Sequence, residues 1–378
     1  MTLALNTPIM RTLQRALSHK RPDGGQGVID FTQWLIDNLP KHLWDNVIVD
    51  ACNNVHIDAR TMPEHRTLFV AHVDTVHHEE GLNHIVKETS KKGYFWRASV
   101  GSCLGADDGA GVAMLMHMIH NNVSGYYIFT QGEECGGIGA KFLARHQPEL
   151  LDEFDRAIAF DRRGIDSVIT HQGRGRCCSD TFGNALAAAL NDAHPRLMYL
   201  PDDTGIYTDT AEFTDNIPEC TNISVGYYGE HGDREYLDMY HFEMLSMAVL
   251  NVNWDGLPTE RDPKVRERYE YDYGVSKYSA TNNSIYGMDW DDEDEGMTER
   301  DWAIHDIRGA LEDAREGYTE EILYLIGESV WPEDPALARR HLNAKRLTDD
   351  VINKMMDLTH TYDAPTVLCT IFDALYEG

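Results

Sequence analysis

Between residues 68 and 251 the sequence alternates between short apolar runs and longer segments in which apolar residues recur with helical spacing. These patterns predict strands at 125–130, 156–160, 166–171 and 220–226, and helices at 108–121, 137–146, 180–193 and 236–251. Strands that alternate with helices form sheets covered on both faces. The sequence therefore predicts an α/β fold with a mixed, largely parallel central sheet sandwiched by helices.

The segments ahead of this alternation add smaller elements. Helices are predicted at residues 9–20 and 28–38, and a hairpin at residues 47–57 around the turn pair Asn53-Asn54. Two further strand candidates, 83–87 and 94–98, lie between the strand that ends at His72 and the motif of Asp107. His77 and His78, in the same interval, are assigned to a solvated loop rather than to a metal site.

Ionisable side chains follow the first apolar strand, which ends in His72-x-Asp74. Strand side chains alternate faces, so both residues project the same way. A carboxylate there can hold one imidazole nitrogen and leave the other for a metal. The alternative is an ordinary histidine at a strand end beside a solvated aspartate.

Two more acidic pairs lie at similar junctions. Asp107 and Asp108 open an apolar helical run, where the helix dipole stabilises a carboxylate, although a plain helix cap would look the same. Glu133 and Glu134 follow a strand, and consecutive residues point in different directions, so that one could bind a metal while the other faces water. Exposed Glu-Glu pairs are common, but all three segments in this order favour metal-assisted hydrolysis.

These motifs resemble those of the co-catalytic zinc exopeptidases, which include leucyl aminopeptidases, peptidase T, glutamate carboxypeptidases and related deacylases. The resemblance spans residues 28 to 255. The positions that match the family pattern are His72, Asp74, Asp107, Glu133, Glu134, Asp161 and His231.

The resemblance implies two divalent metal ions, most simply Zn²⁺, with Mn²⁺ or Co²⁺ possible. By the family arrangement, one ion would be held by His72 and Asp161 and the other by Glu134 and His231, with Asp107 bridging. Glu133 would be the general base and Asp74 the partner of the first histidine. A cis peptide bond would follow the bridging aspartate.

The late histidine and the substrate pocket depend on weaker signals. His231 follows a strand and precedes an acidic residue and a helix, as the family histidine does, whereas His241 lies inside the predicted helix. Asp209 and Phe213 resemble the family segment beside the substrate pocket. They are the candidate substrate-binding residues.

The short interval of 70 positions from Asp161 to His231 resembles the compact, lid-less aminopeptidase branch. We therefore expect an aminopeptidase acting on peptides, with a carboxypeptidase or an N-acyl amino-acid deacylase as alternatives. Arginines would suit a substrate carboxylate, and the candidates are Arg162, Arg163, Arg174 and Arg176. A non-catalytic scaffold is the alternative of another class, but it should lack a ligand or the base, and all are present.

Composition excludes several partners. The formal charge of −30 repels phosphate backbones, so no nucleic-acid partner is expected. No apolar run is long enough for a membrane span, and the N-terminus lacks a secretory apolar segment, which predicts a cytoplasmic protein. Seven cysteines without a repeated spacing argue against a disulfide framework, and the adjacent pair Cys177-Cys178 lacks zinc-knuckle spacing.

The length of 378 residues favours more than one domain. We expect a catalytic domain at 1–258, an acidic, tyrosine-rich linker at 259–297 and an all-α module at 298–378, with helices near 319–328, 335–344, 348–359 and 364–376. The acidic run at 289–295 is interpreted as a solvated linker rather than a metal-binding tail. The helical module is a candidate surface for self-association or a protein partner.

Overall fold

The computed structural model describes residues 7–90, 93–99, 101–172 and 175–265, and beyond them 311, 322, 348, 351–355, 371 and 375. The chain divides into two compact units, Met1–Tyr273 and Gly274–Gly378. In the second unit, residues 351–355 are helical, within the helix predicted at 348–359. Of the other predicted C-terminal helices only single residues are described, and Ile322 in 319–328 and Ile371 and Leu375 in 364–376 are helical. The acidic run lies outside the described residues.

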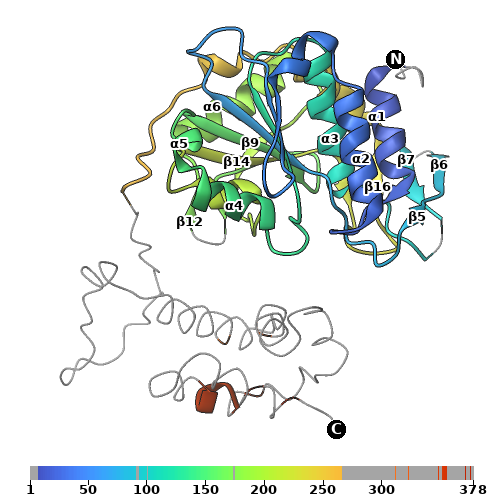
Figure 1. The fold of residues 1–378 in the computed structure, drawn as a ribbon. Coiled ribbons are helices and arrows are strands. Elements are labelled where there is room, and N and C mark those ends of the chain that lie inside the picture. The colour runs from blue at the N-terminus through green and yellow to red at the C-terminus, as the bar shows by residue number, and fades with distance from the viewer. Residues whose placement is uncertain are drawn as a thin grey trace, which may run out of the picture. The chain divides into compact units, whose positions relative to one another are not determined.

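The first unit is built on an eight-stranded sheet (Figure 1). Its strands in spatial order are β13 (Leu200–Asp202), β10 (Ser167–Ile169), β14 (Glu219–Ser224), β9 (Arg156–Arg162), β4 (Thr67–His72), β8 (Tyr126–Thr130), β3 (Val55–Asp58) and β2 (Val47–Val49). The neighbours of β4 run parallel to it, as do β9 with β14 and β10 with β13, whereas β3 pairs antiparallel with both β8 and β2, and β10 with β14. The sheet is thus mixed and largely parallel at its centre, as the sequence predicts.

Helices cover both faces of this sheet. They are α1 (Pro8–Leu17), α2 (Gln26–Asp37), α3 (Ala106–His120), α4 (Ile138–His146), α5 (Pro148–Leu151), α6 (Asp180–Ala193) and α7 (Met239–Ala248). Alternate residues of β4 show the two layers, because Phe69 and Ala71 join the core beneath α1, α3 and α7, and Leu68 and Val70 join the core beneath α4. The central strand is therefore buried on both faces, which fixes its C-terminal end within the molecule.

The central helix α3 packs directly against the sheet and α1, and nearly all of its residues are buried (Figure 1). Gly111 allows this close approach. A Cβ atom there would lie 2.3 Å from the Phe160 carbonyl oxygen of β9. The N-terminus of α3 is therefore held at the edge of the sheet where the parallel strands end.

A second, four-stranded sheet borders the same region. Its order is β15 (Tyr227–Tyr228), β16 (Tyr236–Asp238), β7 (Gly93–Ala98) and β6 (Ile85–Ser90). The other elements among the described residues of the first unit are two small ladders and three short 3-10 helices. They are β1 (His19–Lys20) with β5 (Gly81–Leu82), β11 (His171–Gln172) with β12 (Gly175–Arg176), and η1 (Lys41–Asn46), η2 (Asp209–Phe213) and η3 (Trp254–Gly256).

The expected helix at 236–251 is wrong at its start. Residues 236–238 pair with β7 as a strand, and the helix begins only at Met239, where the Asp238 side chain accepts hydrogen bonds from the backbone N–H groups of Tyr240 and His241. The predicted strand at 166–171 is divided into β10 and β11 in the structure. No separate strand is predicted at the positions of the short strands β13 and β15. Strands of two or three residues are too short to show a period in the sequence.

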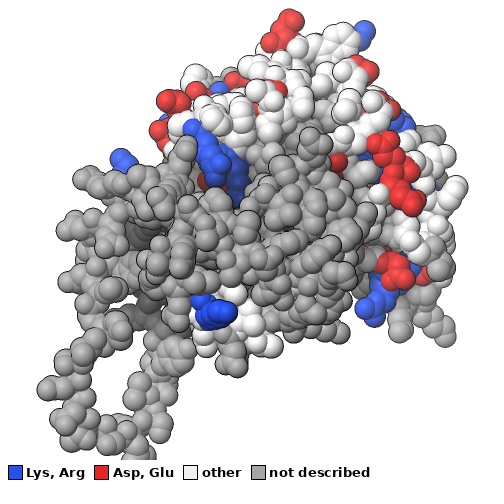
Figure 2. All heavy atoms as spheres, turned by 60° about the horizontal axis from the view of Figure 1, so that its bottom comes forward, with Lys and Arg blue, Asp and Glu red and all other residues white. Residues whose placement is uncertain are grey.

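None of the described helices has the length and hydrophobicity that a bilayer span requires. On the face seen in Figure 2, acidic and basic side chains are interspersed over the described residues.

Candidate active site

The motif residues come together where the parallel strands end. His72 closes β4, Asp161 lies near the end of β9, and Glu134 follows β8. Asp107 is in the first turn of α3, and His231 is on the loop between β15 and β16. Carboxyl ends of neighbouring parallel strands meet at one edge of a sheet, which explains how residues far apart in sequence share a site.

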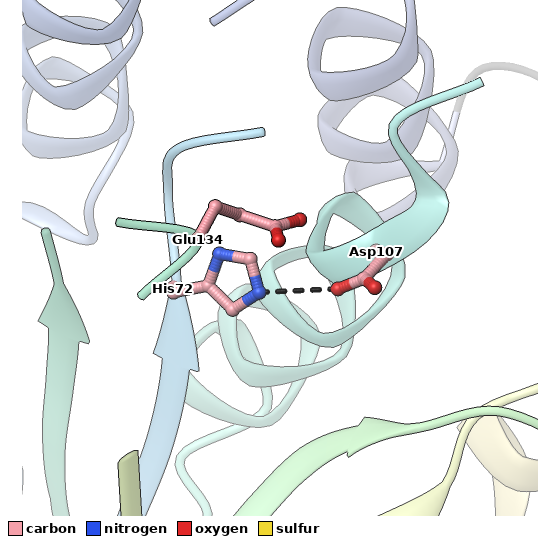
Figure 3. A group of neighbouring side chains, drawn as sticks. All are labelled: His72, Asp107 and Glu134. Atoms are coloured by element: carbon pink, nitrogen blue, oxygen red, sulfur yellow. Dashed lines mark hydrogen bonds and ion pairs between the residues drawn. The ribbon is translucent and has the colours of Figure 1, made fainter. Parts of the chain in front are cut away.

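Asp107 is the centre of this cluster. Its Oδ1 atom lies 3.1 Å from Nε2 of His72, and its Oδ2 atom lies 3.2 Å from Nε2 of His231. Figure 3 shows the His72 ring and the Asp107 and Glu134 carboxylates facing a common space. The peptide bond between Asp107 and Asp108 is cis, as the family resemblance implies.

Two further acids complete the pairs. Oε2 of Glu134 lies 3.0 Å from Nε2 of His231, and Oδ1 of Asp161 lies 3.6 Å from Nε2 of His72. Asp161 is oriented by two hydroxyl groups, since Thr208 donates to its Oδ2 at 2.7 Å and Tyr227 donates to its Oδ1 at 3.0 Å. Glu134 therefore lies beside His231, and Asp161 lies beside His72.

Asp74 connects the histidine strand to the glutamate pair. It is fully buried, and its Oδ1 lies 3.4 Å from Nδ1 of His72. Its two oxygens also accept hydrogen bonds from the backbone N–H groups of Glu133 and Glu134, at 3.2 and 3.1 Å. One buried carboxylate thus positions an imidazole ring and the backbone of both glutamates.

Burial and neighbouring carboxylates raise the pKa values of both glutamates of the cluster. Burial raises the pKa of Glu134 to about 7, and the Asp107 carboxylate adds to the shift. Burial also raises the pKa of Glu133 well above its ordinary value, with further contributions from Asp161 and Asp209. Without cations, some of these acids would have to hold protons.

The histidines shift in the same direction. Hydrogen bonds to Asp107 and Glu134 raise the pKa of His231 to about 11. Burial acts to lower the pKa of His72, but the carboxylates of Asp161 and Asp107 outweigh it and raise the pKa well above 6.5. The surrounding carboxylates therefore favour positive charge at both imidazoles. Divalent cations bound between these side chains would balance the same negative charge.

The donor set fits such cations. Ligand atoms of His72, Asp107 and Glu134 lie within 4.8 Å of one another, and so do those of His72, Asp108 and Asp161. Oε1 of Glu134 is buried without a hydrogen-bond partner in the structure, an arrangement that is costly unless a cation is nearby. Mixed imidazole and carboxylate ligation suits Zn²⁺.

The sequence of this region also matches a known protein family. The profile of Peptidase family M28 matches residues 54–243, half of the chain, and this span contains all the motif residues. The chain belongs to peptidase family M28. No curated protein sequence matches the chain.

Among solved structures, the M28 domain is similar to two bacterial enzymes. Aminopeptidase PepT from Bacillus cereus ATCC 10987 has 14% identity and a TM-score of 0.52, over 67% of this chain and 99% of its own. A tripeptidase from Staphylococcus aureus subsp. aureus Mu50 has 14% identity and a TM-score of 0.53, over 65% of this chain and 96% of its own. These likenesses show that the chain shares the fold of these peptidases, and the M28 family makes the chain a metal-dependent peptidase.

Several residues of the M28 domain were missed by sequence reasoning. Asp108 lies beside His72, but its oxygens accept hydrogen bonds from the backbone N–H groups of His72 and Gly111, at 3.2 and 2.9 Å. Tyr227 and Thr208 orient Asp161, and no local pattern marks them. Glu235, four positions after His231, contacts the segment that leads into α3.

Two other histidines are placed differently from the motif pair. His241 is buried in α7, where burial lowers its pKa to about 4, and its Nε2 lies 3.0 Å from the Tyr199 hydroxyl. His77 corrects an expectation, because it is buried rather than solvated, with Nδ1 2.7 Å from the Thr75 hydroxyl and Nε2 donating to the Cys103 carbonyl at 3.2 Å. The neighbouring His78 is exposed.

The two candidate pocket residues have different surroundings. Asp209 is buried, its carboxylate accepts a short hydrogen bond from Thr130, and burial raises its pKa to about 7. Phe213 is fully buried in the core beneath α4. The structure gives Phe213 a packing role, and a contact with substrate stays a prediction for both residues.

Proposed function

We propose that this M28 peptidase is an aminopeptidase that uses two divalent cations, most simply zinc. The observation that carries the proposal is the environment of Asp107, whose two oxygens each face a different histidine at 3.1 and 3.2 Å. A carboxylate placed in this way is suited to bridge two ions. The ion pairs of His72 with Asp161 and of His231 with Glu134 then supply the ligands on either side.

Bound cations supply Lewis acidity, which polarises a carbonyl group and acidifies water. The protein's own part is proton transfer and orientation. Glu133 takes a proton from the attacking water and returns it to the nitrogen of the broken amide bond, so that water is divided between the two products. Its pKa, which burial raises, suits a group that must both accept and release a proton.

Asp74 is the positioning residue of this reaction. It accepts hydrogen bonds from the backbone N–H groups of Glu133, the base, and Glu134, the neighbouring metal ligand. These bonds fix the position of both residues just after β8. Its contact with Nδ1 of His72 leaves Nε2 directed at Asp107 and Asp161. Removal of Asp74 would therefore disturb both the ligands and the base.

The pairing of nearby arginines favours an aminopeptidase over a carboxypeptidase. Arg162 donates to the Thr204 carbonyl and lies 3.8 Å from Asp202, Arg163 lies 3.3 Å from Glu230, and Arg176 lies 2.6 Å from Asp180. Each of these guanidinium groups already faces an acidic side chain. A substrate carboxylate would need an arginine that is not paired with an acid in this way. Arg174 lies outside the described residues. An acidic site is better matched to the free ammonium group of a peptide.

The test uses the full chain loaded with zinc and three substrate types: a chromogenic amino-acid amide, its N-acetylated form, and an N-acylated dipeptide with a free carboxylate. We expect cleavage only of the amino-acid amide, which has a free amino group. Glu133→Gln should keep its zinc and lose about 10²- to 10⁴-fold in kcat. Glu149→Gln, at an exposed glutamate of α5, is the control and should match the wild type.

Two results would overturn parts of the proposal. Comparable cleavage of either acylated substrate would favour a deacylase or carboxypeptidase. Full activity of Glu133→Gln would remove Glu133 from the role of base.

We also propose that the protein acts in the cytoplasm on peptides and that residues 298–378 mediate self-association or bind a partner. The odd number of cysteines and their lack of a repeated spacing are typical of proteins from a reducing compartment. Light scattering of the full chain beside a chain ending at residue 297 tests the second part, and an unchanged oligomeric state would contradict self-association.

A further inference from the structure

The side chain of Glu235 is buried at the point where the second sheet meets α3. It lies at the end of the loop that joins β15 to β16, and only 2% of the residue is exposed. Its Oε2 accepts hydrogen bonds from the backbone N–H groups of Leu104 and Gly105, at 2.7 and 2.9 Å. Its Oε1 accepts two more from Ala106 and Asp107, at 2.7 and 3.1 Å. A single carboxylate thus binds four consecutive N–H groups.

These donors lie ahead of the regular turns of α3, since Leu104 precedes the helix and the backbone of Asp107 and Asp108 is not helical, with ψ of 103° and 36°. The first N–H groups of a helix have no partner within it, and a short polar side chain at the N-cap usually accepts from them. The N-cap residue of α3 is Gly105, which has no side chain and a φ of +72°. The missing acceptor comes instead from Glu235, which is 128 to 131 positions away along the chain.

The segment held in this way ends at Asp107, whose carboxylate faces both histidines of the site. The loop that carries Glu235 also carries His231, four positions earlier. The same loop therefore brings one imidazole to Asp107 and fixes the backbone from which Asp107 projects.

We propose that Glu235 is a positioning residue that sets the Leu104–Asp107 segment, and with it the Asp107 carboxylate, in its metal-binding arrangement before any metal binds. The inference rests on the proposed metal site. It differs from a purely stabilising role, because it predicts that metal affinity depends on Glu235 beyond any loss of stability.

Glu219 provides a matched control. It is also fully buried, and its carboxylate also accepts four hydrogen bonds, from the backbone N–H groups of Glu260, Arg261 and Ser179 and from the Ser179 hydroxyl. It begins β14, and none of these donors belongs to a motif residue. Replacing either glutamate with glutamine leaves one acceptor oxygen and adds an NH₂ group that faces N–H donors.

The experiment measures Zn²⁺ affinity of the full-length wild type, Glu235→Gln and Glu219→Gln by competition with a chromophoric chelator, together with each thermal midpoint. We expect both variants to melt lower. Zinc affinity should fall about 10- to 100-fold for Glu235→Gln only, the range found when a residue that supports a metal ligand is replaced. Equal zinc affinity in Glu235→Gln and wild type, or an equal fall in both variants, would overturn the inference. A wild type that binds no zinc would instead overturn the proposed function, and the inference with it.

Hydrogen exchange of the metal-stripped wild type gives a second test, which also decides the matter if Glu235→Gln does not fold. If Glu235 fixes the segment before metal binds, the amides of residues 104–107 should exchange as slowly without zinc as with it. Fast exchange of these amides in the metal-stripped protein would overturn the inference.

Discussion

His241 makes the stability of this protein depend on pH in a way that can be calculated. Burial lowers its pKa to about 4 from an ordinary value of 6.5. The imidazole is neutral in the fold, where its Nε2 lies near the Tyr199 hydroxyl and the Ser224 carbonyl. The unfolded chain therefore binds a proton that the folded chain rejects.

The sign follows from this difference. Above pH 6.5 neither state is protonated at His241, so its full contribution to stability is present. As the pH falls from 6.5 to about 4, only the unfolded state gains a proton, and stability is lost over this window. The limit of the loss is about 3 kcal/mol, and the part between pH 7 and pH 5 is about 2 kcal/mol.

The assay is urea unfolding of the metal-stripped full chain at pH 7 and pH 5, followed by tryptophan fluorescence. His241→Gln keeps a neutral polar side chain at this position and cannot be protonated. We expect it to lose about 2 kcal/mol less than the wild type between the two pH values. His78→Gln, at an exposed histidine, should lose as much as the wild type. An equal loss in His241→Gln and the wild type would refute the reasoning.

The remaining predictions concern ligands and packing. His231→Ala should reduce zinc bound per chain, measured by mass spectrometry of the metal, whereas His241→Gln should not; the reverse result would exchange their roles. Tyr227→Phe removes the hydroxyl that donates to Asp161 and should weaken zinc about 10-fold with little change in stability, so an unchanged affinity would contradict its orienting role. Phe213→Ala should lower the free energy of unfolding by about 3–5 kcal/mol, whereas a raised KM with unchanged stability would place Phe213 in the substrate pocket.

The strand and helix order of the catalytic unit was largely predictable from local patterns. The helix expected at 180–193 has these bounds in the structure, and the strand at 125–130 is displaced by one residue at its start. Both elements have a clear apolar period and a defined start. Elements without such a period, such as β15, could not be predicted from the sequence.

For the candidate site, the sequence indicates which motif residues the structure brings together, but not the residues that hold them in place. Asp74 follows His72 by two residues, just past the end of β4, so an extended backbone alone predicts their contact. Glu235 and Leu104 are 131 positions apart, and only the tertiary fold brings them together. His77 was misplaced for the same reason, because its partner Cys103 lies 26 positions away.

The two histidines of the site differ sharply in access to solvent. The His231 side chain is 55% exposed, on a loop where its own φ is +61°, whereas the His72 side chain is 1% exposed at the end of the central strand. With two ions bound as proposed, a chelator would reach the ion beside the exposed His231 more readily than the ion beside the buried His72. The two ions should then dissociate at different rates, and brief chelation should leave a protein that retains only the inner one.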